Sequence, residues 1–111
     1  MHRVRLADGD TLYREGDPAA QAYVILSGRI AMRRADADIH ADKGAVLGVS
    51  ALVGRPYGST ARAVGLTDVL AFSRRELQAM IRSDPDRALP IIDAIIDLVA
   101  KMHEVFERPG K

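Results

Sequence analysis

Few residues in this chain have types and spacings that could do chemistry. The three histidines, His2, His40 and His103, lie far apart in the sequence and match no metal-ligand spacing. The chain has no cysteine, which excludes thiolate catalysis, zinc–thiolate sites and disulfides. The sequence contains no Walker glycine loop, no nucleophile elbow and no carboxylate pair placed by a motif. It therefore predicts a protein that is not an enzyme and holds no metal.

The elements that would position a binding site follow from the apolar pattern. From residue 4 to 72, apolar residues form short clusters separated by Gly, Asp and Pro, which is typical of strands joined by tight turns. The expected strands are residues 11–14, 23–26, 28–33, 39–41, 59–64 and 68–72, with a hairpin turn at 35–38. Residues 23–26 are continuously apolar while residues 29–33 alternate, a mixture that predicts a closed roll.

After Phe72 the pattern becomes helical. Ser73 and Glu76 have the spacing of a capping box, which predicts a short helix to about residue 83. The pair 84–85 then resembles an N-cap with proline at the first helical position, opening a second helix to about residue 108. Pro90 removes a main-chain hydrogen bond and crowds the preceding turn. We therefore expect either a kink at Pro90 or a helix that begins nearer Leu89.

The second helix has an unusually wide apolar face. Two stripes run along it at alternating spacings of four and three: Ala88, Ile92, Ile95, Val99, Met102 and Phe106, and beside them Ile91, Ile95, Leu98, Met102 and Val105. One edge would pack on its own barrel while the other meets the same helix of a second subunit about a two-fold axis. The residues expected at that homodimer contact are Ile92, Ile95, Val99, Met102 and Phe106. The alternative is that both stripes are intramolecular core.

A family resemblance rests on residues 9–30. They combine a glycine turn, an Arg-Glu-Gly-Asp turn and an apolar strand that ends in Ser-Gly. This segment resembles the first signature of the cyclic-nucleotide-binding domain family, and the stretch from Lys43 through the second helix follows the same family in order and spacing. The resemblance implies one domain over residues 1–111, similar to the regulatory domain of cAMP receptor protein. Residues 1–72 would form a double-stranded β-helix or jelly-roll barrel, and residues 73–111 the C-terminal helices, with the family's N-terminal helix missing or reduced to residues 1–6.

The family's phosphate-binding cassette corresponds to residues 46–63. In the family, a glutamate accepts a hydrogen bond from the ribose hydroxyl and an arginine pairs with the cyclic phosphate. Here Val49 stands at the glutamate position and Tyr57 at the arginine position. A hydrogen bond to a charged group contributes about 1.5–3 kcal/mol, so losing both should weaken cAMP or cGMP binding by roughly two to four orders of magnitude. The candidate pocket residues are Gly48, Val49, Ser50, Ala51, Tyr57, Gly58, Ser59 and Thr60.

Two further expectations concern what replaces this grip. Arg55 and Arg62 are candidate compensating cations if the cassette is rearranged, and Tyr57 is a candidate to fill the vacant pocket with its own ring and hydroxyl. The candidate ligand is then a cyclic nucleotide or another small anion. The alternative function is a ligand-independent dimerisation or protein-interaction module on the same scaffold.

Composition limits the partners. The chain is 48% hydrophobic and 28% charged, with a formal net charge of +1 and 5% aromatic residues, which does not indicate direct binding to nucleic acid or to a membrane surface. Without a signal-peptide pattern or a membrane-length apolar run, the expected location is the cytoplasm. The family's transcription factors carry a helix-turn-helix after the long helix, whereas this chain stops at Lys111. Output is therefore expected through an unidentified partner protein, unless the chain is a fragment.

Overall fold

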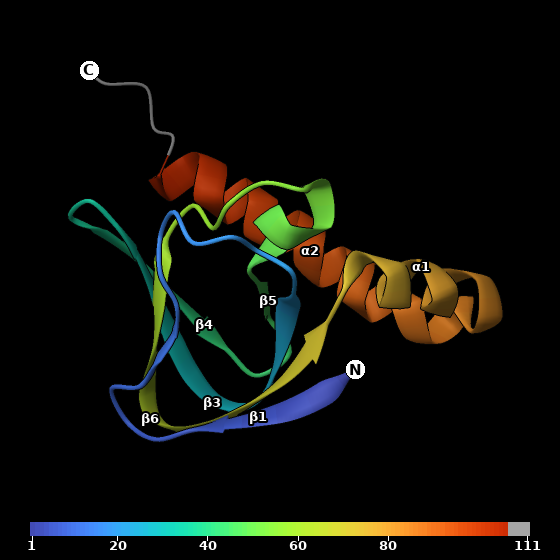
Figure 1. Cartoon of the computed structure of the whole chain (residues 1–111), viewed down its shortest axis with the longest axis horizontal. Coiled ribbons are helices and arrows are strands. Elements are labelled where there is room, and N and C mark those ends of the chain that lie inside the picture. Colours follow the sequence, from blue (N-terminus) through green and yellow to red (C-terminus); the bar gives the residue numbers. More distant parts are fainter. Residues whose placement is uncertain (107–111) are drawn as a thin grey trace.

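The structure is a computed structural model, and it describes residues 1–106. Six strands and one short 3-10 helix are followed by two α-helices (Figure 1). The strands are β1 His2–Leu6, β2 Thr11–Tyr13, β3 Ala22–Arg34, β4 Ala37–Asp42, β5 Val46–Leu47 and β6 Thr60–Phe72; the 3-10 helix η1 is Val49–Val53, and the α-helices are α1 Arg74–Ser83 and α2 Pro85–Val105. The predicted class, mainly β with two C-terminal helices, is confirmed.

The strands form one curled antiparallel sheet. Its order is β1-β6-β3-β4, with β2 added to β6 and β5 added to β3. Long β3 and β6 run side by side from Ala22 opposite Phe72 to Arg33 opposite Thr60, and they curve together around the core (Figure 1). The prediction of a closed roll was wrong in one respect: within residues 1–106, edge strands β1 and β4 do not pair with each other, so the roll stays open.

The strands at residues 23–26 and 28–33 are a single strand, as are those at 59–64 and 68–72. Gly28 does not interrupt β3 but marks an irregularity in its register with β6. Its φ is +90°, and an added Cβ would lie 2.5 Å from both the Leu66 carbonyl oxygen and Thr67 Oγ1. Thr67 is fully buried there, and its hydroxyl donates to the Arg29 carbonyl at 3.1 Å. Glycine is thus required because the two strands approach each other too closely for a side chain.

Two strands were missed by sequence reasoning. Where the family's N-terminal helix was expected to be missing or reduced to residues 1–6, residues 2–6 form β1, which pairs antiparallel with β6 along its whole length. β5 is only two residues long and pairs with Tyr23 and Val24 of β3. Both are set by long-range pairing rather than by a local pattern.

The helix starts agree with the predicted capping signals. Ser73 accepts from the Glu76 amide at 3.1 Å while the Glu76 carboxylate accepts from the Ser73 amide at 2.9 Å, which completes the capping box. Helix α2 begins at Pro85 and continues through Pro90, so the later start near Leu89 was wrong. The carbonyl that Pro90 leaves without a donor belongs to Asp86, which is exposed and can bond water. The predicted end near residue 108 lies outside the described residues.

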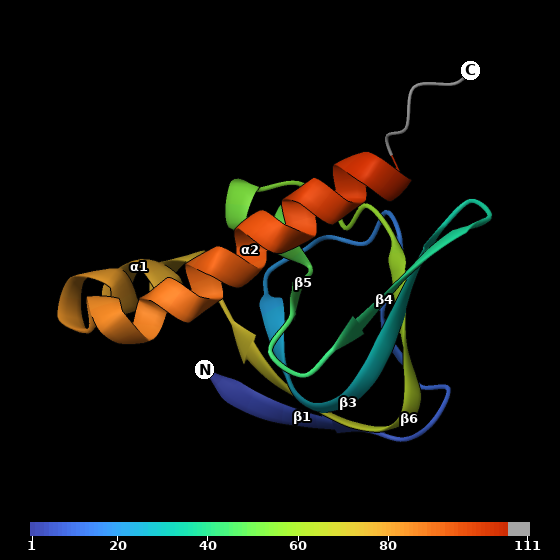
Figure 2. The same cartoon turned by 180° about the vertical axis from the view of Figure 1, so that it is seen from behind.

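Helix α2 lies across the open side of the roll, over β4 and β5 (Figure 2). Ala88 and Leu98 are its buried residues, and Met102, Val105 and Phe106 pack against the core between the sheet layers. Ile91, Ala94 and Ile95 pack against a second cluster around Phe72 and Leu77. Within residues 1–106, no helix is both long enough and apolar enough to cross a membrane.

Candidate functional site: a cassette closed by tyrosine

The segment after β5 builds one wall of the candidate site. Gly48 follows β5 with a φ of +73° and caps helix η1 (Val49–Val53), which ends at Gly54 with a φ of +70°. Left-handed glycines at both ends let this five-residue helix fit between two strands. The chain then passes through Pro56 and Tyr57 and enters β6 at Thr60. The predicted frame of the cassette is therefore present, with a short helix between two strands.

Tyr57 points into the interior of this frame. Its exposed fraction is 7%, and its hydroxyl donates to the Gln21 carbonyl oxygen at 2.7 Å. Its ring is stacked on Tyr13 with centroids 3.9 Å apart and an interplanar angle of 13°. Tyr23 continues the stack, 6.1 Å from Tyr13, so all three tyrosines of the chain gather at this point. Burial raises the pKa of Tyr57, and likewise that of Tyr13, so both hydroxyls are neutral at physiological pH.

The main chain fixes Tyr57 as firmly as its side chain does. Its amide donates to the Asp17 carbonyl at 3.0 Å, and its carbonyl accepts from the Gly16 amide at 2.8 Å. These two bonds tie the cassette to the Arg-Glu-Gly-Asp turn, 40 residues earlier in the chain. Gly48 leaves space for the ring, since a Cβ there would lie 3.2 Å from Tyr57 Cε1. The turn, Gly48 and Tyr13 together hold Tyr57 inward.

Only a small space remains beside the ring. The cavity next to Tyr57 has a volume of about 10 Å³, which is close to the minimum for one water molecule. Six of the predicted pocket residues line it: Gly48, Val49, Ser50, Tyr57, Gly58 and Ser59. Val49 and Tyr57, the two substituted positions, thus face the same space. Ala51 is buried in η1 instead, and Thr60 accepts a hydrogen bond from the Glu15 amide at 3.0 Å.

The two candidate compensating cations do not reach this space. Arg62 is exposed between buried Ala61 and Ala63 on β6, so its side chain lies on the outer face of the sheet. It borders an outer groove together with Glu15 and Arg33. Arg55 is exposed in the turn after η1 and is not among the residues around the cavity. The suggested compensation by Arg55 or Arg62 therefore has no support in this arrangement.

Four residues around the cavity were not predicted. Tyr13 and Met32 come from β2 and β3, and Leu98 and Met102 come from α2. Tyr13 and Met32 lie in strand patterns, where an inward position indicates only core. Leu98 and Met102 belong to the apolar face of the second helix, but Met102 was expected at the homodimer contact, and the sequence left open which edge of the helix packs on the barrel. Helix α2 thus rests directly on the space that Tyr57 fills.

The predicted dimer face is divided between two environments. Ile95, Met102 and Phe106 pack against the chain's own core, and Arg34 lies 5.5 Å from the centre of the Phe106 ring. Ile92 is half-buried and Val99 is 53% exposed. The other large apolar residues exposed on α2 are Leu89 and Ile96, which are 53% and 60% exposed. The outward apolar stripe is therefore Leu89, Ile92, Ile96 and Val99, at spacings of three and four.

Comparisons with known proteins agree with this architecture. Residues 3–84 match the protein family described as the cyclic nucleotide-binding domain. A cyclic nucleotide-binding-like protein from Brucella abortus is 31% identical, with a TM-score of 0.62 over 74% of this chain and 76% of that one. The N-terminal domain of a transcriptional regulator from Streptomyces coelicolor A3(2) is 26% identical, with a TM-score of 0.67 over 94% of this chain and 77% of that one.

A third structure, the c-di-GMP-responsive regulator CLP of Xanthomonas campestris, is 22% identical, with a TM-score of 0.72. It matches 90% of this chain and 53% of its own length, and it shows the shared fold. No curated protein matches the sequence. The open β roll, the short helix of the cassette and the long C-terminal helix form the fold that these structures share. This chain belongs to the cyclic nucleotide-binding domain family.

Proposed function

We propose that this chain is a homodimeric regulatory domain whose nucleotide pocket is occupied by its own Tyr57. On this proposal cAMP and cGMP bind weakly or not at all, and no reaction is catalysed. The observation that carries the proposal is the cavity of about 10 Å³ beside the stacked Tyr57 ring. Pockets for cofactor-sized ligands measure roughly 300–1,000 Å³. A nucleotide would have to displace a tyrosine that is held by a hydrogen bond and by stacking.

The chemistry of the pocket supports the same conclusion. Val49 and Tyr57 supply neither the carboxylate nor the guanidinium that grips the nucleotide in this family. Arg55 and Arg62 lie outside the cavity, and the nearby hydroxyl of Ser59 carries no charge. Displacement of Tyr57 would also break its bond to the Gln21 carbonyl and leave that acceptor without its donor. Each of these changes costs free energy that a bound nucleotide would have to supply.

Calorimetric titration of four proteins with cAMP and cGMP tests the proposal. The native chain should give no heat at near-millimolar nucleotide, and Tyr57→Ala should bind weakly at most, because it opens space without adding charge. Val49→Glu combined with Tyr57→Arg should bind cAMP, because two charge-assisted hydrogen bonds strengthen binding by roughly 10²–10⁴-fold. Val49→Gln with Tyr57→Met is the matched neutral control. Tight binding by the native chain, or a folded Glu/Arg variant that binds nothing, would contradict the proposal.

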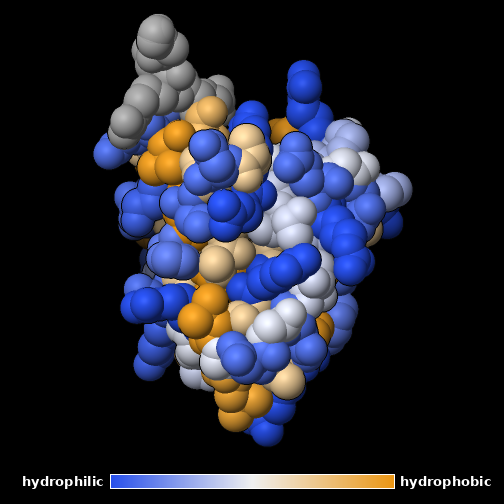
Figure 3. Space-filling view, turned by 90° about the vertical axis from the view of Figure 1, so that its left-hand side faces the viewer, coloured by the Kyte–Doolittle hydropathy of each residue, from blue (hydrophilic) through white to orange (hydrophobic). Residues whose placement is uncertain are grey.

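The homodimer is proposed on the outward apolar stripe of α2. Leu89, Ile96 and Val99 are each more than half exposed, and with half-buried Ile92 they form one continuous stripe. Their alternating spacing of three and four suits packing against a copy of the same helix about a two-fold axis. The side of the molecule shown in Figure 3 is mainly hydrophilic, with apolar side chains in separate small groups.

Light scattering coupled to size-exclusion chromatography tests the dimer. The native chain should elute at about twice 12.1 kDa. Ile96→Glu should lower the mass to that of a monomer at the same protein concentration, because it places a carboxylate in the centre of the stripe. Leu66→Glu is the matched control, since Leu66 is 65% exposed on β6, away from α2. A native monomer at every concentration, or a dimer that only Leu66→Glu disrupts, would refute this interface.

A second candidate function is a ligand-independent interaction module that acts through an unidentified partner protein in the cytoplasm. The observation that favours it is that Leu98 and Met102 of α2 border the cavity already filled by Tyr57. The helix would then hold one position without any nucleotide. If this is correct, the thermal midpoint of the native chain should not change with cAMP or cGMP, and a rise would favour a sensor instead.

A further inference from the structure

A larger groove lies on the other side of Met32 and Leu98 from the cavity that Tyr57 fills. It has a volume of about 440 Å³ and opens between β4, the turn that follows β4, and helix α2. Met32 and Leu98 also border the Tyr57 cavity, so they form the wall between the two spaces. The groove is within the size range of small-molecule sites, roughly 300–1,000 Å³.

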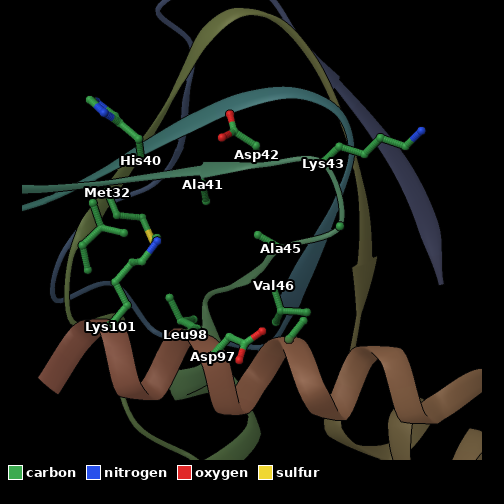
Figure 4. A pocket seen from close by; sticks show the side chains of 13 residues that line it. Met32, His40, Ala41, Asp42, Lys43, Ala45, Val46, Asp97, Leu98 and Lys101 are labelled. Carbon is green, nitrogen blue, oxygen red and sulfur yellow. The ribbon is translucent and has the colours of Figure 1, made fainter. Parts of the chain in front are cut away.

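The side chains that face the groove are of two kinds. Figure 4 shows Met32, Ala41, Ala45 and Leu98 directed toward it, and these form an apolar floor. Asp97 and Lys101 reach into it from α2, one helical turn apart. His40, Asp42 and Lys43 also border the groove, but Figure 4 shows their side chains directed away from it. The charged groups available inside are therefore one carboxylate and one ammonium group.

These two charges are not used by the fold. In the part of the chain that the structure describes, neither Asp97 nor Lys101 takes part in an ion pair, although their i,i+4 spacing suits one. Asp42 on the rim differs, because Arg29 holds its carboxylate at 2.7 Å. An unpaired acid and an unpaired base over an apolar floor are complementary to a ligand that carries both opposite charges beside an apolar group.

We propose that this groove binds a small zwitterion with an apolar side chain, of which an apolar α-amino acid such as leucine is the simplest example. Its ammonium group pairs with Asp97, its carboxylate pairs with Lys101, and its side chain lies on Ala41, Ala45 and Leu98. A ligand with only a carboxylate would pair with Lys101 but be repelled by Asp97. A ligand with only an ammonium group would pair with Asp97 but be repelled by Lys101. The pair of charges thus selects against ligands with one charge.

The groove is independent of both proposed features of the nucleotide scaffold. It does not include Tyr57, and it lies on a side of α2 nearly opposite Leu89 and Ile96, so dimerisation through the outward stripe leaves it open. A ligand in it would bridge β4 and α2. Binding would therefore stabilise the docked position of α2 and raise the thermal midpoint.

Titration of the native chain, residues 1–111, followed by amide NMR tests this proposal. The probes are L-leucine, 4-methylpentanoate, which lacks the ammonium group, 3-methylbutylamine, which lacks the carboxylate, and glycine, which lacks the side chain. With up to about 10 mM ligand, L-leucine should give saturable shifts at Ala41, Ala45 and Leu98, and the other three should bind about tenfold more weakly or not at all.

Two variants connect the effect to the charges. Lys101→Gln should weaken L-leucine binding about tenfold but strengthen that of 3-methylbutylamine, because it removes the charge that repels the amine. Asp97→Asn should likewise weaken L-leucine binding about tenfold but strengthen that of 4-methylpentanoate. Lys43→Gln is the matched control, because Lys43 borders the groove but its side chain is directed away from it. This variant should bind L-leucine as tightly as the native chain does. The proposal is overturned if L-leucine gives no saturable shifts or if the mono-charged analogues bind equally well. It is also overturned if the groove signals shift only with protein concentration, which would mean that a second copy of the chain covers it.

Discussion

Truncation of Tyr57 is the sharpest test of a pocket filled from within. The ring is 7% exposed and stacked on Tyr13, so Tyr57→Ala removes a buried aromatic side chain and leaves a cavity between β6, η1 and α2. Such truncations cost about 3–5 kcal/mol of unfolding free energy. Tyr57→Phe keeps the ring and loses only the bond to the Gln21 carbonyl, which should cost about 1 kcal/mol. The difference in unfolding free energy between Tyr57→Ala and Tyr57→Phe measures how much the ring stabilises the fold.

The assay is urea unfolding followed by far-ultraviolet circular dichroism, at one fixed protein concentration because dimerisation contributes to stability. Leu66→Ala is the matched control, since Leu66 is 65% exposed and its truncation should change stability by less than about 0.5 kcal/mol. Phenol has the shape of the lost ring and hydroxyl, so it should stabilise Tyr57→Ala and leave the native chain unaffected. If Tyr57→Ala lost less than about 1 kcal/mol, the ring would not be filling the pocket. Should Tyr57→Ala fail to fold, Tyr57→Leu provides a milder truncation for the same comparison.

Three further predictions concern the pH dependence, the bend of β3 and the start of α1. Burial raises the pKa of Tyr13 and Tyr57 above the ordinary 10.0, so their neutral forms favour the folded state. Stability should be complete below pH 10 and should fall above it, by about 1.4 kcal/mol per pH unit for each tyrosine. Tyr57→Phe should reduce that slope in alkaline unfolding, and an unchanged slope would contradict the burial. In thermal unfolding, Gly28→Ala should lower the midpoint far more than Gly9→Ala. Both glycines have positive φ, but only at Gly28 would a Cβ lie 2.5 Å from a backbone oxygen. Equal losses of thermal stability would refute the close approach. Ser73→Ala should cost about 1 kcal/mol by removing the N-cap of α1, measured by urea unfolding, and no loss would show that the cap is dispensable.

The sequence predicted local structure best where a short pattern carries the cause. The capping box at Ser73 and the proline start of α2 are decided by neighbouring residues, and both were correct. β1 could not be found this way, because three of its five residues are His or Arg, and its pairing with β6 more than 60 residues away makes it a strand. Gly28 appeared to end a strand because glycine usually marks a turn, whereas here it permits a close approach within one strand.

The candidate site was predicted where its residues are close in the sequence, and it was missed where they come from distant strands and from the helix. Residues close in the sequence, from Gly48 to Ser59, were identified because the cassette is a contiguous pattern. Tyr13, which stacks on Tyr57 from 44 positions earlier, has no signal that distinguishes it from other inward strand residues. The α2 stripes were ambiguous because Ile95 and Met102 belong to both. Only the position of the helix on the roll shows that these two face inward while Ile96 faces out.

The location of Tyr57 links the cassette to the outward face of α2. In a domain whose pocket must be filled by a ligand, the helix that rests on the pocket can change position with occupancy. Here Leu98 and Met102 rest on a space that Tyr57 already fills, and Tyr57 is fixed by two main-chain bonds to the turn at residues 16–17. A nucleotide could change the position of α2 only by displacing that tyrosine. A ligand in the groove beside Asp97 would contact α2 without displacing Tyr57. A ligand that controls the outward stripe would therefore act more directly from the β4 side of the helix than from the cassette.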